Sequence, residues 1–227
     1  MKNLKILLEG SLLADIEDTM KHGDQNVDTV LRKKLFDEWF NPYMKIKRKS
    51  PVGIVFHDMG NPVDGDIRQK VFDECVSVDN DVIVIDLGKS KSGLRLTVNI
   101  CVGEGLPLIK VINSIDSKFH SALQITADPK NKQTIDLSKY IHKGTSVNSV
   151  VYNLPDSVEL KDASFPGDIK EKVIYNNCHF KNLKGNWPKC TKIFDRQTQI
   201  NMIFQTTGIP SNTSYESDFH GGKLTIR

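Results

Sequence analysis

The sequence lacks the paired cysteines that build zinc sites and disulfide scaffolds. Its four cysteines are Cys75, Cys101, Cys178 and Cys190, and none of them forms a C-x-x-C pair. Structural zinc sites usually take their ligands from such short paired spacings, and small disulfide scaffolds need a higher cysteine density. We therefore predict no metal site and a reducing compartment. Cys101 lies in the apolar run 98–102, which predicts a buried free thiol.

Long hydrophobic runs and an excess of charge of one sign are also absent. No segment approaches the ~18 consecutive apolar residues of a membrane-spanning helix. Lys and Arg number 31 against 28 Asp and Glu, for a net charge of +3, which does not favour a nucleic-acid partner. With 38% hydrophobic residues, the 227-residue chain can still bury a core. We expect no membrane association and a protein partner, and the composition is compatible with a homo-oligomer.

Complete catalytic and cofactor motifs are missing as well. G-x-S-x-G, H-E-x-x-H and a G-K-[ST] phosphate loop do not occur, so we predict no catalytic or cofactor-binding residues, no cofactor and no enzymatic activity. One alternative stays open. A histidine and three carboxylates follow a predicted strand, which would suit a hydrolase-type site: His57, Asp58, Asp64 and Asp66. The same stretch holds the Gly, Asn, Pro and Asp residues of an ordinary turn.

The first forty residues have helical periodicity. Apolar residues recur at spacings of three and four over 4–20 and again over 27–40, and Asn41-Pro42 ends the second pattern. We predict a helical arm over residues 1–44 that docks onto a partner. The predicted docking residues are Leu4, Leu8, Leu12, Ile16, Trp39 and Phe40.

The middle region, residues 45–150, is predicted to be β-rich. Short β-branched or alternating runs occur at 52–56, 82–87, 94–102, 109–115 and 122–127, with one helical pattern at 67–75. The polar turn 89–93 predicts that 82–87 and 94–102 pair as a hairpin. The predicted fold class is therefore α+β, with a helical arm followed by a β-rich body.

The last region, residues 151–227, contains an internal similarity. The sequence of residues 158–165 aligns with that of residues 173–180, with apolar residues at matching positions. The shared form V-x-L-x-x-N-C-x-F resembles the leucine-rich repeat, which implies a short stack of parallel strands at the C-terminus. The alternative is a pair of adjacent sheet strands with similar patterning.

The opening Met1-Lys-Asn-Leu-Lys-Ile-Leu-Leu-Glu-Gly10 resembles the short leader of tailed-bacteriophage proteins, including those of phages of gut Bacteroidetes. In some phages a head-maturation protease cuts such leaders after Leu-x-Glu. The resemblance implies a processing site at Leu7, Glu9 and Gly10, and a location in the virion or the host cytoplasm.

These observations favour a non-enzymatic, phage-encoded virion or assembly protein that acts through protein–protein contacts. The first alternative is a leucine-rich-like recognition module that binds a host or phage protein; parallel strands over residues 154–205 would favour it, and antiparallel strands would exclude it. The second alternative is the hydrolase-type enzyme at His57 and Asp58.

Overall fold

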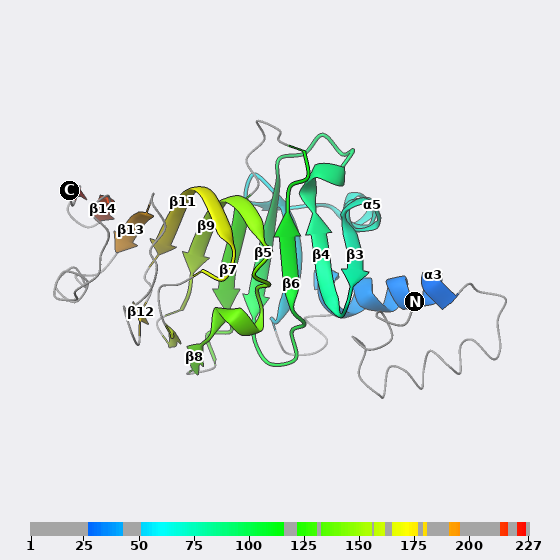
Figure 1. Ribbon diagram of the computed structural model, residues 1–227, viewed down its shortest axis with the longest axis horizontal. Coiled ribbons are helices and arrows are strands. Elements are labelled where there is room, and N and C mark those ends of the chain that lie inside the picture. The colour runs from blue at the N-terminus through cyan, green and yellow to red at the C-terminus, as the bar shows by residue number, and fades with distance from the viewer. Residues whose placement is uncertain are drawn as a thin grey trace.

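The structure is a computed structural model that describes residues 27–42, 51–115, 122–130, 133–155, 157–161, 165–176, 179–180, 191–195, 214–217 and 222–225. Side-chain packing is described up to residue 170. The described part is β-rich, with short helices near its N-terminal end and a long stack of strands (Figure 1). The helix predicted over residues 4–20 lies outside the described residues.

Two helical segments pack against the strands. Helix α3 (Val27–Leu35) continues into the π-helical turn η1 (Phe36–Phe40), which ends where the Asn41 N–H donates to the Phe36 carbonyl at 2.9 Å. Helix α5 spans Gly65–Cys75. Both were predicted from sequence periodicity, and both predictions are confirmed. Asn41 ends the first segment in an extended conformation, as expected before Pro42.

Nine strands of the described chain form one large sheet. Its order is β15-β14-β13-β11-β9-β7-β5-β1-β2. The pairs from β5 to β14 are parallel, whereas β1 with β5 and β15 with β14 are antiparallel. The strand bounds are β1 Gly53–Asp58, β2 Asn61–Pro62, β5 Leu96–Val102, β7 Ala122–Ala127, β9 Ser146–Asn153, β11 Asp168–Asn176, β13 Thr191–Asp195, β14 Ser214–Ser217 and β15 Gly222–Thr225.

Two smaller sheets complete the body. One has the order β3-β4-β6, with β3 Val76–Asp79, β4 Val82–Asp86 and β6 Ile109–Ile112; the other has the order β12-β10-β8, with β8 Gln133–Ile135, β10 Val158–Leu160 and β12 His179–Phe180. From β4 to β13 the strands alternate between a small sheet and the large sheet. The even-numbered strands belong to a small sheet, and the odd-numbered strands belong to the large one. The fold is therefore a solenoid-like stack of coils, in which one coil consists of a strand of a small sheet and the strand of the large sheet that follows it.

Interior side chains of the large sheet form two continuous ladders. Phe56, Val98, Leu123 and Val150 are register partners in one ladder, and Ile54, Ile100, Ile125 and Tyr152 in the other. All eight are at most 1% exposed. Burying an aliphatic or aromatic side chain of this size contributes about 1.5–3 kcal/mol, so the ladders fix the register of the coils.

Two pairing predictions are wrong. Strands β4 and β5, predicted to form a hairpin, lie in different sheets. Residues 158–165 and 173–180 are not equivalent repeats either, because β10 belongs to a small sheet and β11 to the large one. The register instead matches Tyr152 with Tyr175 and Leu160 with Phe180. These offsets of roughly 20–25 residues lie near the period of leucine-rich repeats.

The parallel stack is longer than the sequence predicted. It was expected only within 151–227, yet its first strand in the large sheet, β5, begins at Leu96, and β4 already pairs in parallel with β6 in a small sheet. The boundary drawn at residue 150 falls inside β9, which pairs with β7 on one side and β11 on the other. The large sheet therefore runs without a break from the middle region into the last one.

Candidate functional site

The side of the large sheet that faces away from the core is the candidate site. Successive side chains of a strand point to opposite faces, so the residues between the buried ladder positions lie on this side. We define the outer face by its members on β1, β5, β7 and β9, of which Cys101 and Ser149 are buried: Val55, His57, Thr97, Asn99, Cys101, Ala122, Gln124, Thr126, Ser149, Val151 and Asn153.

The strand register arranges these side chains in rows. One row runs His57, Thr97, Ala122 and Ser149, and the next runs Val55, Asn99, Gln124 and Val151. Cys101 and Thr126 are partners in a third row. Because the coils stack in register, each strand contributes one small or medium-sized side chain to each row. The rows together form a regular surface.

On β1, β5, β7 and β9 the outer face contains no Asp, Glu, Lys or Arg, although 26% of the chain is charged. On the next strands the register continues the rows to Lys172 of β11 and Lys192 of β13. Its polar members carry hydroxyl, amide or imidazole groups, which both donate and accept hydrogen bonds. Thr126 Oγ1 donates to Asn99 Oδ1 at 3.3 Å, so neighbouring coils are linked on this face. Over these four strands the face can form hydrogen bonds and apolar contacts with a partner without presenting a charged side chain.

Charged groups connect coils elsewhere in the fold. Asp136 precedes the short turn η3 (Leu137–Lys139) and accepts hydrogen bonds from the Ser138 N–H at 3.1 Å and from Lys161 Nζ at 2.8 Å. The interaction with Lys161 is the main reason why the pKa of Asp136 is lowered to about 2. Asp86 occupies the same position before η2 (Leu87–Lys89), where its Oδ1 accepts from the N–H groups of Gly88 and Ser114. These carboxylates stabilise turns and loops.

The predicted hydrolase residues do not come together as a site. His57 and Asp58 are consecutive on β1, so their side chains point to opposite faces of the sheet. Asp58 Oδ1 accepts a hydrogen bond from the Arg95 N–H at 3.0 Å, while Asp64 and Asp66 are exposed at the start of α5. Within the described residues, no group of three or more His, Cys, Asp or Glu could hold a metal ion.

The predicted docking residues divide into two groups. Trp39 and Phe40 belong to the protein's own core, at 8% and 0% exposure. The Phe40 ring stacks on Phe56 at a centroid distance of 5.6 Å and meets the edge of Phe72 at 4.9 Å. In this structure neither side chain is presented to a partner. Leu4, Leu8, Leu12 and Ile16, and the processing residues Leu7, Glu9 and Gly10, lie outside the described residues.

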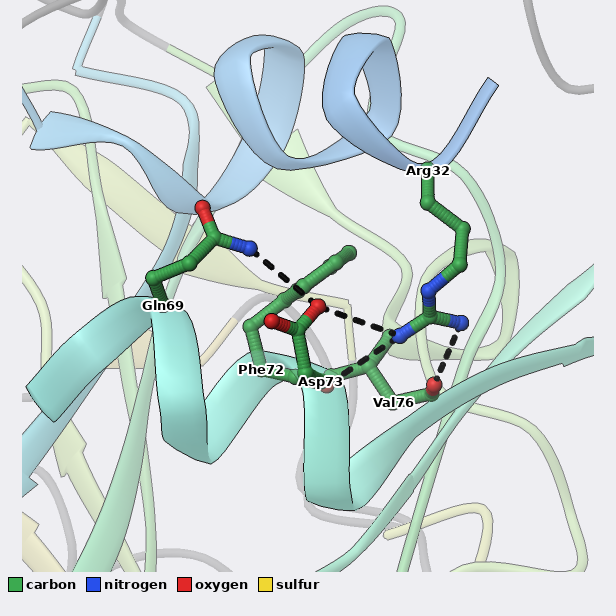
Figure 2. A network of polar contacts seen from close by, with 5 residues as sticks. All are labelled: Arg32, Gln69, Phe72, Asp73 and Val76. Carbon is green, nitrogen blue, oxygen red and sulfur yellow. Dashed lines mark hydrogen bonds and ion pairs between the residues drawn. The ribbon is translucent and has the colours of Figure 1, made fainter. Parts of the chain in front are cut away.

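Arg32 attaches helix α3 to the C-terminal end of α5 (Figure 2). Its Nη1 donates to the Val76 carbonyl at 3.1 Å and its Nη2 to the Phe72 carbonyl at 3.5 Å. The guanidinium also lies 4.9 Å from the centre of the Phe72 ring and forms an ion pair with Asp73 at 3.7 Å. A cation at the negative end of a helix dipole is stabilising, so the network has a structural role in fixing the helical segment on the body.

The described cysteines are buried free thiols, as predicted for Cys101. Burial is the main reason why the pKa of Cys75 is raised to about 12, so its reactive thiolate form is scarce near neutral pH.

Sequence reasoning missed the outer face as a site. The signal was present as alternation: in 97–102 and 122–127, small or polar residues occupy every second position between buried apolar ones. That pattern indicates a half-exposed strand. It does not indicate which strands are neighbours, and only the register assembles Asn99, Gln124 and Val151 into one row.

Comparisons with known proteins give no relative. No family model, curated protein or solved structure matches this chain. Among the described helices, none has the length and apolar character needed to cross a membrane.

Proposed function

We propose that this protein is a non-enzymatic assembly or recognition protein that binds a protein partner through the outer face. The observation that carries the proposal is the row arrangement of uncharged side chains across β1, β5, β7 and β9. Depletion of charged residues is the compositional feature that distinguishes the centre of protein interfaces from the remaining surface.

The parallel pairing of the later strands supports a recognition module. β11 with β13, β13 with β14, and β10 with β12 are all parallel. Antiparallel pairing in this region would have excluded a leucine-rich-like stack. Stacked coils suit binding because each adds one strand, and therefore one more residue in each row, to a continuous surface.

The origin of the protein in a tailed phage is a separate part of the proposal. It rests on the leader-like residues 1–10 and on the match of Leu7, Glu9 and Gly10 to a prohead cleavage form. Mass spectrometry of purified virions tests it. Peptides that begin at Gly10 would support processing, and the absence of every peptide of this chain would contradict a virion location.

Site-specific photo-crosslinking in the producing cell tests the binding function. A photoreactive amino acid replaces Gln124 on the outer face or, as the control, Thr134, which is exposed on β8 of a small sheet. We expect crosslinks to another polypeptide chain from position 124 and far fewer from position 134. Equal crosslinking from the two positions, or none from 124, would contradict the proposal.

A further inference from the structure

We propose that the exposed side of the small sheet β3-β4-β6 carries a binding site for a phosphate monoester, formed by Lys110, His142 and Lys143. The site lies on a different sheet from the outer face, so it is independent of the proposed protein-binding function. Two features support it. Backbone hydrogen bonds fix the segment that carries His142 and Lys143, and a lysine and a histidine converge beside a glycine without a counter-ion.

The segment that follows the turn η3 is held against β6 by backbone hydrogen bonds. The Ile109 N–H donates to the Tyr140 carbonyl at 2.8 Å, and the His142 N–H donates to the Ile109 carbonyl at 2.8 Å. These bonds form the parallel bridge between Ile109 and Ile141. Ile109 is buried, so the next residue along, Lys110, lies beside His142 on the side of the sheet that faces away from the core.

Lys110 and His142 converge at Gly144. A Cβ on Gly144 would lie 3.2 Å from Lys110 Cε and 3.1 Å from His142 Nδ1, so both side chains border the same position. The Gly144 N–H donates to His142 Nδ1 at 3.0 Å, which leaves the proton of the neutral imidazole on Nε2 as a donor. Lys143 is exposed at the tip of the same turn, which the Thr145 N–H closes by donating to the His142 carbonyl at 2.9 Å.

The positive charge of this group is not balanced within the part of the chain that the structure describes. There, no carboxylate forms an ion pair with Lys110 or Lys143. Lys110 is half-buried, and a lysine that is removed from water is normally paired with an acceptor. Glu104 and Asp136 act on Tyr140, whose pKa is raised first by burial and then by these two charges. The group at Lys110 can therefore take an anion from solution.

A phosphate monoester matches this set of donors. It carries a charge of about −1.5 to −2 at pH 7, close to that of two lysines in magnitude, and it has three strong acceptor oxygens. Lysine binds phosphate as a point charge, and charge-assisted hydrogen bonds are roughly twice as strong as neutral ones. A carboxylate has only two oxygens and a phosphate diester only a single charge, so both should bind more weakly.

Titration of the isotope-labelled full-length chain with methyl phosphate, followed by amide NMR at constant ionic strength, tests the site. We expect a saturable shift of the Gly144 amide signal with a Kd of roughly 1–10 mM. Dimethyl phosphate and acetate, as the diester and carboxylate probes, should each bind at least about fivefold more weakly, because they offer fewer charges or oxygens.

Three variants locate the site, and their amide spectra show that each is folded. Lys110→Met removes the charge and keeps the length of the side chain, and it should weaken methyl phosphate binding at least about fivefold. Gly144→Ala removes no charge but fills the position between Lys110 and His142, so it should also weaken binding, measured at the His142 amide. Lys130→Met, at an exposed lysine after β7, is the control and should bind like the wild type.

A Gly144 signal that moves linearly with probe concentration, or equally with acetate, would overturn the proposal. So would dimethyl phosphate that binds as tightly as methyl phosphate, or a Lys110→Met variant with wild-type affinity. None of these outcomes bears on the outer face, because crosslinking at position 124 tests that surface separately.

Discussion

At the residue scale, Met59 stands out because its backbone conformation does not suit its side chain. It occupies the two-residue turn between β1 and β2, where Met59 and Gly60 have φ values of 48° and 95°. Such hairpin turns favour Asn-Gly, since the left-handed conformation costs other L-residues about 1–2 kcal/mol. The Met59 side chain is 68% exposed and gains little from burial in return.

We therefore expect Met59→Asn to raise the free energy of unfolding by about 1 kcal/mol, because Asn tolerates the left-handed region. Urea denaturation measures the change. Gly60→Ala is the control at the neighbouring position and should lower stability, since its φ of 95° is strained for any residue with a Cβ. A destabilised Met59→Asn variant would show that the methionine side chain makes contacts that outweigh the strain.

A second residue-scale prediction concerns Asp136 and pH. Its pKa is lowered from 3.8 to about 2, chiefly by Lys161 and next by Ser138. A carboxyl group with a lowered folded-state pKa stabilises the protein above its unfolded pKa, and that contribution is lost as the pH falls through the folded pKa. The stability advantage of wild type over Asp136→Asn should therefore be full above about pH 4 and should shrink between pH 4 and pH 2.

The size of this advantage is expected to be below about 1 kcal/mol, because the Lys161 side chain is 59% exposed and water screens the pair. Denaturant titrations of both proteins at a series of pH values measure it. Lys161→Met should reproduce most of the effect. An advantage that stays constant down to pH 2 would mean that the carboxylate does not titrate in this range.

At the element scale, the segment formed by α3 and η1 belongs to the folded body. Phe36 and Phe40 both contact Phe72 of α5, and Phe40 also contacts Phe56 of β1. Helical periodicity correctly predicted where this segment lies and where it ends. It could not predict what covers the apolar side, because an amphipathic pattern is the same whether the helix packs on its own chain or on another one.

Phe40→Ala tests this integration. Truncating a fully buried phenylalanine should lower the free energy of unfolding by about 3–5 kcal/mol. Lys33→Ala, at an exposed position of α3, should change it by less than about 0.5 kcal/mol. Chemical denaturation of both variants gives the comparison. If Phe40→Ala were as stable as Lys33→Ala, the segment would have to be a separable arm.

At the scale of the whole molecule, both ends of the parallel stack carry an antiparallel strand. β1 adds to β5 at one end and β15 to β14 at the other. Beyond β1 lies the two-residue strand β2, which contains Pro62. A very short edge strand with a proline discourages further strand addition at this end of the sheet, which agrees with the proposed use of the outer face for binding.

The sequence by itself determined the helical segments at 27–40 and 67–75 and the strands β1, β4, β5, β6 and β7, because periodicity and β-branched composition act over a few neighbouring residues. The strand β9 (Ser146–Asn153) was not among the predicted runs. Asn80 and Asp81, between β3 and β4, have positive φ values, which suit Asn and Asp. The tertiary structure alone decided which strands pair. β4 pairs with β6 and not with β5, and β10 and β11 belong to different sheets. The same pairing brings Asn99, Gln124 and Val151 into one row. Pairing between strands some 25 residues apart depends on how all the buried side chains fill one core, and no local pattern contains that information.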